Sequence, residues 1–192
     1  CFDGTTFTDG EKSLTVKEIG IESVNGQNDW LTVTASFSGK ASPPPIVAGF
    51  AEVEVDTETG KVTLLDMVGV VDCGTVVNKS LARVQAEGGL AQGVGMALYE
   101  DVRYSTAGQL RTDSFMDYKI PSRLDLPNIR VAFEESYEPS GPFGAKSIGE
   151  VVINTPTPAI IEAIRNAVGV EIHSLPATAE KVYMALQNSK MA

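Results

Sequence analysis

The alternation of apolar and polar residues predicts β-strands in the first half of the chain. Segments 14–21 (LTVKEIGI) and 30–37 (WLTVTASF) are rich in β-branched residues and flank a turn-like VNGQND. In 51–56 (AEVEVD) apolar and acidic residues alternate strictly, which predicts a strand with one face in water. The segment DTETG (56–60) predicts a hairpin turn, and 61–72 (KVTLLDMVGVVD) predicts a returning, more buried strand.

Helical spacing begins after this hairpin. Residues 78–99 predict a helix, in which one face is marked by Leu81, Val84, Gly88, Ala91 and Gly95. Beyond it, 101–115 predicts a second hairpin with its turn at Ala107-Gly108. A proline-punctuated segment then leads into a strand at 129–134.

The last third of the chain carries the clearest boundary signals. Thr157-Pro158 predicts a helix start, and Gly169 predicts the end of that helix. Between them lies an apolar stripe, formed by Ile160, Ile161, Ile164 and Val168. EIHSLP (171–176) is typical of a strand end, and 178–187 predicts a final helix. Strands that come first, joined by hairpins and followed by helices, favour an α+β fold.

Composition and charge argue against several classes of function. The chain has 192 residues and a formal net charge of −10, without a basic run, which argues against binding to nucleic acid or to an anionic membrane surface. No apolar stretch approaches the roughly 20 residues of a membrane span. The cysteines, Cys1 and Cys73, give no support to a disulfide framework, so a reducing, cytoplasmic location is the simplest expectation. The start at Cys1 instead of Met indicates a chain cut from something longer.

The predicted helix 78–99 is unusually rich in glycine. Gly88, Gly89, Gly93 and Gly95 each cost up to about 1 kcal/mol relative to alanine inside a helix. One explanation is close packing of the helix against a sheet. The other is a ligand lying against bare backbone, because Gln85, Gly88, Gly89 and Gln92 share one stripe of the helix. Such a stripe would suit a flat, polar heterocycle.

The loop GPFGAKSIGE (141–150) ends on a carboxylate, Glu150, just before apolar sequence. Glu150 is either a positioned acid or base, or a residue that favours the positive end of a helix dipole. Lys146 could cap, pair with Glu150 or meet a phosphate, and Cys73 is interpreted as a buried, inert thiol. His173 is the only histidine, which argues against a histidine-ligated metal and against a Ser-His-Asp triad.

Four motifs in order resemble one known family. They are VVDCGTVVN, LARVQAEGGLAQGVGMALYED, DYKIPSRLDLPNI and GPFGAKSIGE. Together they are similar to the molybdenum hydroxylases (xanthine dehydrogenase/aldehyde oxidase), specifically to the C-terminal part of the molybdopterin-binding large subunit. The resemblance covers residues 46–188 and implies an α+β fold of the molybdenum cofactor-binding domain type, a two-layer mixed β-sheet with packed helices. Residues 1–45 are expected to be a lead-in β segment of the same unit, and 46–192 the C-terminal molybdopterin-binding domain.

The resemblance also implies roles for individual residues. Glu150 takes the place of the general base, which accepts the proton of a molybdenum-bound hydroxyl as that oxygen attacks the substrate carbon. A hydride then passes to the sulfido ligand of the metal. Cofactor contacts are implied for Gln85, Gly88, Gly89, Lys146, Ser147, Ile148 and Gly149. The metal is held by the pterin and not by protein side chains. Val151 stands where many relatives have proline.

The implied substrate is a purine or another N-heteroaromatic compound, oxidised with water as the oxygen source. Aldehydes are the second implied substrate class. The implied partners are the rest of the large subunit and the iron–sulfur and flavin (FAD) domains or subunits that carry electrons away. Alone, this chain is expected to be inactive. Two other possibilities stay open: a pterin-binding or assembly module without turnover, and a purely structural domain.

Overall fold

The computed structural model describes residues 1–26, 34–36, 39 and 41–191 of the chain. It contains two compact units, Cys1–Ser38 and Gly39–Ala192, and each is described by itself. None of the helices in the described residues combines the length and the apolar character that a membrane crossing would need.

The first unit contains a short hairpin followed by a helix. Strands β1 (Thr6–Thr8) and β2 (Ser13–Thr15) pair antiparallel, and helix α1 (Val16–Asn25) follows directly. The predicted strand at 14–21 is therefore wrong beyond residue 15. The reason is a capping box: the hydroxyl of Thr15 accepts a hydrogen bond from the amide of Glu18, whose carboxylate accepts one from the amide of Thr15.

The other strand predicted in this region, 30–37, falls largely outside the described residues. Residues 34–36, which are described, are not in a strand.

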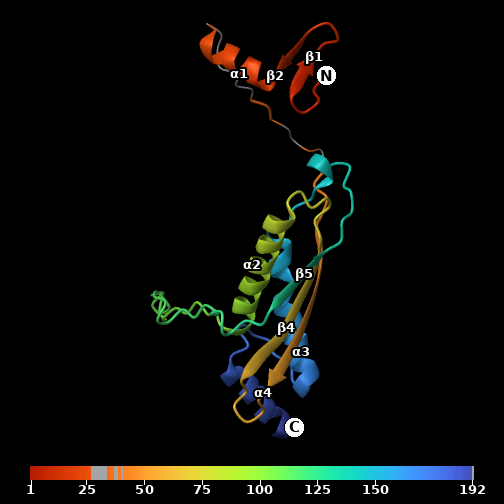
Figure 1. Ribbon diagram of the computed structural model, residues 1–192. Coiled ribbons are helices and arrows are strands. Elements are labelled where there is room, and N and C mark those ends of the chain that lie inside the picture. Colours follow the sequence, from red (N-terminus) through yellow and green to blue (C-terminus); the bar gives the residue numbers. More distant parts are fainter. Residues whose placement is uncertain (27–33, 37–38, 40, 192) are drawn as a thin grey trace. The chain divides into compact units, whose positions relative to one another are not determined.

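The second unit is built on a three-stranded mixed sheet (Figure 1). Strands β3 (Ile46–Val55) and β4 (Val62–Asp72) form the predicted antiparallel hairpin, and β5 (Ile129–Phe133) lies parallel to β4. The turn between β3 and β4 lies where DTETG predicts it: both carboxylate oxygens of Asp56 accept local hydrogen bonds, and Gly60 has a left-handed φ of 74°. The mixed sheet and the α+β class are thus confirmed.

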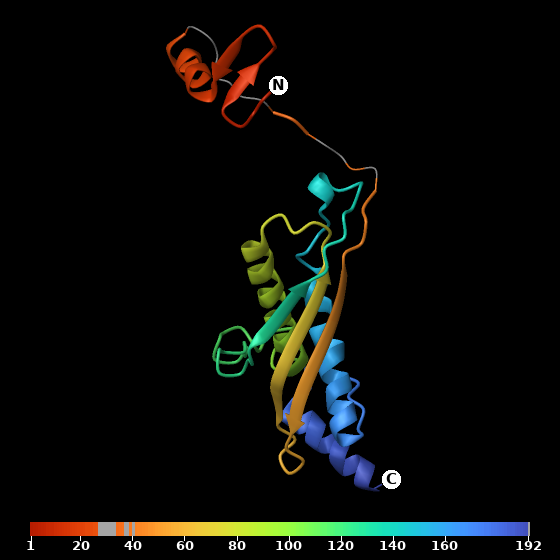
Figure 2. The same ribbon diagram turned by 45° about the vertical axis from the view of Figure 1, so that its right-hand side comes forward.

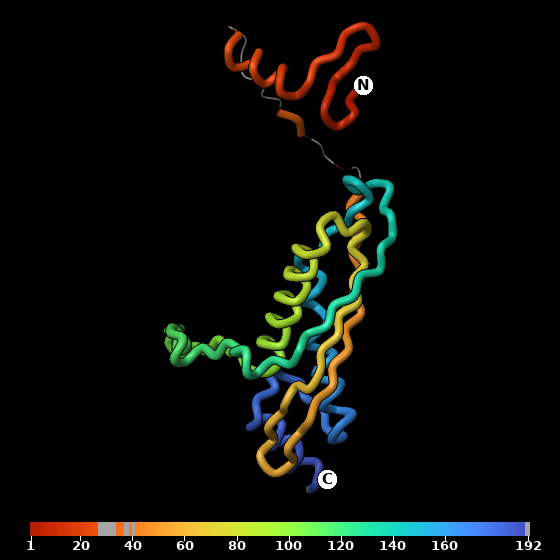
Figure 3. The backbone as a smooth tube through the Cα atoms, in the orientation of Figure 1, coloured from red at the N-terminus to blue at the C-terminus, as the bar shows by residue number. Residues whose placement is uncertain are grey.

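Helices cover one face of this sheet. Helix α2 (Lys79–Leu98) packs on β5 and β4, and α3 (Pro156–Val168) packs on β3 and against α2 (Figure 2). Two short 3₁₀ turns, η1 (Pro142–Gly144) and η2 (Val151–Asn154), lie in the connection between β5 and α3, and α4 (Ala179–Met191) follows. Figure 3 traces this path, including the long excursion between α2 and β5.

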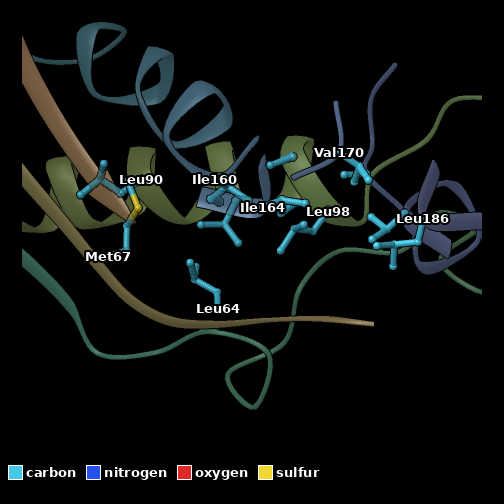
Figure 4. Packing of buried hydrophobic residues seen from close by; sticks show 12 residues of the cluster. Leu64, Met67, Leu90, Leu98, Ile160, Ile164, Val170 and Leu186 are labelled. Carbon is cyan, nitrogen blue, oxygen red and sulfur yellow. The ribbon is translucent and has the colours of Figure 1, made fainter. Parts of the chain in front are cut away.

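The core lies between the sheet and the helices. Met67 of β4, Leu90 of α2 and Ile160 and Ile164 of α3 are fully buried and pack together (Figure 4). The apolar stripe predicted for α3 is therefore confirmed as its packing face. The helix starts at Thr155-Pro156 and not at Thr157-Pro158, because the same Thr-Pro signal occurs twice in succession. It ends at Gly169, whose φ of 71° suits glycine.

Three further predictions need correction. In α2 the buried side chains are Ala86, Leu90, Val94, Ala97 and Leu98, whereas Leu81 and Val84 are exposed. The hairpin predicted at 101–115 has its turn at Gly108 but only one bridge, between Tyr104 and Leu110. His173 lies in irregular structure and not at a strand end.

Candidate functional site

The glycine-rich helix and the loop 141–150 meet in the folded chain. One stripe of α2, the end of the loop 141–150 and the end of η2 line a hollow of about 720 Å³. Its lining residues are Val84, Gln85, Gly88, Gly89, Gln92, Gly149, Glu150, Ile153 and Asn154. The stripe of α2 and Glu150, more than 50 residues away in sequence, thus line the same space.

The glycines of α2 have two different roles. A Cβ on Gly89 would lie 2.3 Å from Cγ2 of Val152, and one on Gly93 would lie 2.6 Å from Cγ of Pro156. Both glycines therefore allow α2 to pack closely on η2 and on the start of α3. A Cβ on Gly88, in contrast, would meet nothing within 4 Å. The backbone at Gly88 is bare toward the hollow, so packing within the described residues does not account for this glycine.

Glu150 is exposed and precedes η2 without capping it. Its side chain makes no capping hydrogen bond with the 3₁₀ turn that it precedes. Its carboxylate takes part in none of the ion pairs found in the described residues. Helix capping and charge pairing therefore do not explain this residue. A carboxylate that lines a hollow without a partner is available to accept a proton from a bound molecule.

Gln85 lies beside the glycine that precedes Glu150. A Cβ on Gly149 would lie 3.8 Å from Nε2 of Gln85. Gln85 and Gly149 line the 720 Å³ hollow and also a second hollow of about 370 Å³. The amide of Gln85, which can both donate and accept hydrogen bonds, is thus placed where the two hollows meet.

Lys146 does not approach Glu150. Its ammonium group lies 2.7 Å from Oδ2 of Asp72 at the end of β4, and only 8% of its side chain is exposed. Asp72 also accepts hydrogen bonds from the amide of Gly74 at 2.9 Å and from the hydroxyl of Ser136 at 2.8 Å. The hydrogen bond from Lys146 is the main cause that lowers the pKa of Asp72 to about 2.

Backbone contacts fix the same loop to the end of β4. The amide of Lys146 donates to the carbonyl of Cys73 at 2.6 Å, and that of Thr75 donates to the carbonyl of Gly144 at 2.8 Å. A Cβ on Gly74 would lie 2.3 Å from the Gly144 carbonyl oxygen, so glycine allows the close approach. Backbone hydrogen bonds and the side chain of Lys146 therefore both hold the loop that leads to Glu150 against the end of β4.

The predicted site residues thus fall into three groups. The structure brings together Gln85, Gly88, Gly89, Gly149 and Glu150 around the larger hollow. Lys146 and Ile148 line the smaller one. Ser147 is exposed and lines neither hollow within the described residues.

Sequence reasoning missed Asp72, Asn154 and the true partner of Lys146. A carboxylate at the end of an otherwise apolar strand, VVD, was the available signal for Asp72. Cys73 is buried as predicted, and burial raises the pKa of its thiol. Among the described residues, no group of three His, Cys, Asp or Glu side chains is placed to hold a metal ion.

Comparison with known proteins identifies a family that matches most of the chain. The family model described as "Molybdopterin cofactor-binding domain" matches residues 2–127. The xanthine dehydrogenase molybdenum-binding subunit of Escherichia coli O157:H7 is 36% identical over 154 residues, which cover 80% of this chain and 20% of that protein. The chain thus spans about a fifth of the length of this relative.

Two solved structures agree with this match. Quinoline 2-oxidoreductase from Pseudomonas putida 86 is 37% identical, with a TM-score of 0.67 over 70% of this chain and 18% of that one. CO dehydrogenase from Oligotropha carboxidovorans superposes on all of this chain with a TM-score of 0.83, over 25% of its own length. Its identity is 24%, so this second likeness shows the fold alone.

Proposed function

This chain belongs to the molybdopterin cofactor-binding domain family of the molybdenum hydroxylases, and we propose that it completes the active site of such an enzyme by supplying the general base, Glu150. The single observation that carries the proposal is the hollow shared by the α2 stripe and Glu150. The base would act on substrate only within the whole large subunit, of which this chain is a part.

The residues around the hollow fit a flat, polar cofactor. Gly88 leaves the helix backbone uncovered, since a Cβ there would meet no atom of the described residues within 4 Å apart from its chain neighbours and the backbone of its own helix. Gln85 offers an amide donor and an acceptor beside it. We propose that Gln85, Gly88 and Gly149 hold the molybdopterin. When bound, this group would supply the redox chemistry and take up the two electrons that leave the substrate carbon.

The part of Glu150 in the reaction is proton transfer. An oxygen nucleophile derived from water would lose its proton to a carboxylate oxygen of Glu150 as it attacks an electrophilic ring carbon. Backbone hydrogen bonds at Gly144 and Lys146 fix the loop that leads to Glu150, so the backbone that carries this residue is already placed at the hollow. Lys146 supports this loop from the side of β4 and takes no part in the proton transfer.

The proposed substrate is a purine or another N-heteroaromatic compound, with an aldehyde as the alternative. The names of two relatives, a xanthine dehydrogenase subunit and a quinoline 2-oxidoreductase, support the heteroaromatic class. Iron–sulfur and flavin groups that carry the electrons onward are proposed to lie on partner domains or subunits.

The test is Glu150→Gln in the complete enzyme, with Glu54→Gln as the matched control. Glu54 is also an exposed glutamate, on β3 and away from the hollow. We expect Glu150→Gln to keep its molybdenum content and to lower turnover by at least about 10²-fold, the scale of general base catalysis. Normal turnover with full molybdenum loading would reject the base. A loss of molybdenum in Glu150→Gln would instead assign Glu150 to cofactor retention.

A further inference from the structure

The long excursion between α2 and β5, residues 101–127, carries apolar side chains on its outside. We call this segment the arm; it projects away from α2 and the sheet in Figures 1 and 3. Leu124 is 97% exposed, Phe115 82% and Met116 80%. Several large apolar side chains exposed on one segment are a feature of interaction surfaces.

Several polar groups of the arm make hydrogen bonds within the arm itself or to its flanking residues. The hydroxyl of Ser114 donates to the carboxylate of Asp117 at 3.1 Å, and the amide of Ser122 donates to that of Asp125 at 2.8 Å. The phenol of Tyr118 donates to the carboxylate of Glu100, just beyond the C-cap of α2. These bonds give the arm a defined shape without using its apolar side chains. An ordered loop that turns its apolar side chains outward is preorganised for docking.

The charge of the arm differs from that of the rest of the chain. Residues 101–127 contain four acidic and four basic residues, so their formal net charge is zero, whereas the whole chain has −10. The arm therefore brings no net charge to a partner surface, in contrast to the acidic chain as a whole.

We propose that the arm docks, through Phe115, Met116 and Leu124, on an apolar surface of the part of the large subunit that lies outside these 192 residues. The lengths of the relatives support the rest of the large subunit as the docking partner of the arm. The xanthine dehydrogenase subunit is matched over only 20% of its length, and the fold of this chain makes up 25% of the CO dehydrogenase chain. In both, most of the polypeptide that could cover the arm is the remainder of the same chain. The proposal does not depend on the role of Glu150.

Photo-crosslinking of the complete large subunit tests the arm directly. Phe115→p-benzoylphenylalanine places a photoreactive ring at a position that is already aromatic and exposed. The same residue at Thr57, in the hydrophilic β3–β4 turn, is the reference. Irradiation of the Phe115 variant is expected to give a crosslinked peptide from the large subunit outside these 192 residues, in higher yield than from position 57.

Other crosslinks would overturn the proposal. A crosslink to the same 192 residues of another copy would assign the arm to a dimer interface, and one to a different subunit would assign it to assembly between subunits. The absence of a crosslink would show that the arm stays in solvent. Leu124→Cys gives an independent measurement: a maleimide should label it more slowly in the folded subunit than in the urea-unfolded one. Equal rates would contradict docking.

Discussion

The Nζ atom of Lys146 lies 2.7 Å from Oδ2 of Asp72, and both side chains are largely removed from water, with 8% and 19% of their surfaces exposed. The pair joins the loop that leads to Glu150 to the end of β4. The lysine of the loop is therefore a structural residue, although its place beside the proposed base could suggest a catalytic one. We therefore expect this contact to stabilise the fold and to help position the proposed base.

Removal of Lys146 should destabilise the chain. Lys146→Met leaves the Asp72 carboxylate with the amide of Gly74 and the hydroxyl of Ser136 as its remaining donors. We expect a loss of about 2–3 kcal/mol in the free energy of unfolding, because a charge that is mostly buried loses its counter-charge. Urea unfolding followed by circular dichroism measures this loss.

The exposed pair Arg165–Glu162 provides the control for Lys146→Met. Its side chains are 53% and 59% exposed, so Arg165→Met should cost less than about 1 kcal/mol. A coupling free energy near zero between Lys146→Met and Asp72→Asn in a double-mutant cycle would show that the pair contributes no more than a surface contact.

The same pair predicts a pH dependence of stability. The pKa of Asp72 is about 2 in the folded chain, below the ordinary value of 3.8. A lowered folded-state pKa stabilises the fold above the unfolded pKa, and this stabilisation is lost as pH falls from about 4 to about 2. The free energy of unfolding should fall more steeply in this window for the wild type than for Asp72→Asn, by on the order of 1–2 kcal/mol.

The comparison with Asp72→Asn is needed because other carboxylates also titrate in this range. Hydrogen bonds or ion pairs lower the pKa values of Asp56, Asp66 and Glu135 as well. Identical pH profiles for the wild type and Asp72→Asn would remove Asp72 as a source of the acid sensitivity.

Local signals predicted the sheet hairpin and α3 because the deciding contacts are local. The Asp56 turn and the αL glycine Gly169 act within a few residues of their own position. The strand predicted at 14–21 was wrong beyond residue 15, also because of local contacts. Its β-branched residues were outweighed by the capping hydrogen bonds between Thr15 and Glu18, which start a helix.

The site could be predicted only in part. Helical spacing alone places Gln85, Gly88 and Gly89 on one stripe, and that stripe does line the hollow. The approach of Glu150 to the stripe is a long-range contact, so periodicity could not predict it. The pairing of Lys146 with Asp72 spans 74 residues and was missed for the same reason.

Loss of the Gln85 amide should weaken cofactor retention. In the complete enzyme, Gln85→Ala removes the polar side chain shared by the two hollows. We expect less molybdenum per protein by elemental analysis, because polar atoms of the pterin would lose a hydrogen-bond partner. Gln187→Ala, in α4 and away from both hollows, should keep its full metal content. Unchanged molybdenum in Gln85→Ala would contradict a contact between Gln85 and the cofactor.

Adjacent glycines of α2 should respond in opposite ways to alanine. Gly89→Ala would place a Cβ 2.3 Å from Val152, so we expect it to lower the free energy of unfolding by about 1–3 kcal/mol. Gly88→Ala meets nothing within 4 Å, and the higher helix propensity of alanine should stabilise this chain by up to about 1 kcal/mol.

In the complete enzyme the methyl group of Gly88→Ala would occupy space that we assign to the pterin, so its molybdenum content should fall although the fold becomes more stable. This pattern separates loss of cofactor from loss of stability, because a general folding defect would lower both the free energy of unfolding and the molybdenum content. Full molybdenum content in Gly88→Ala would show that the bare backbone at Gly88 faces something other than the cofactor. The hollow could then no longer be assigned to the pterin.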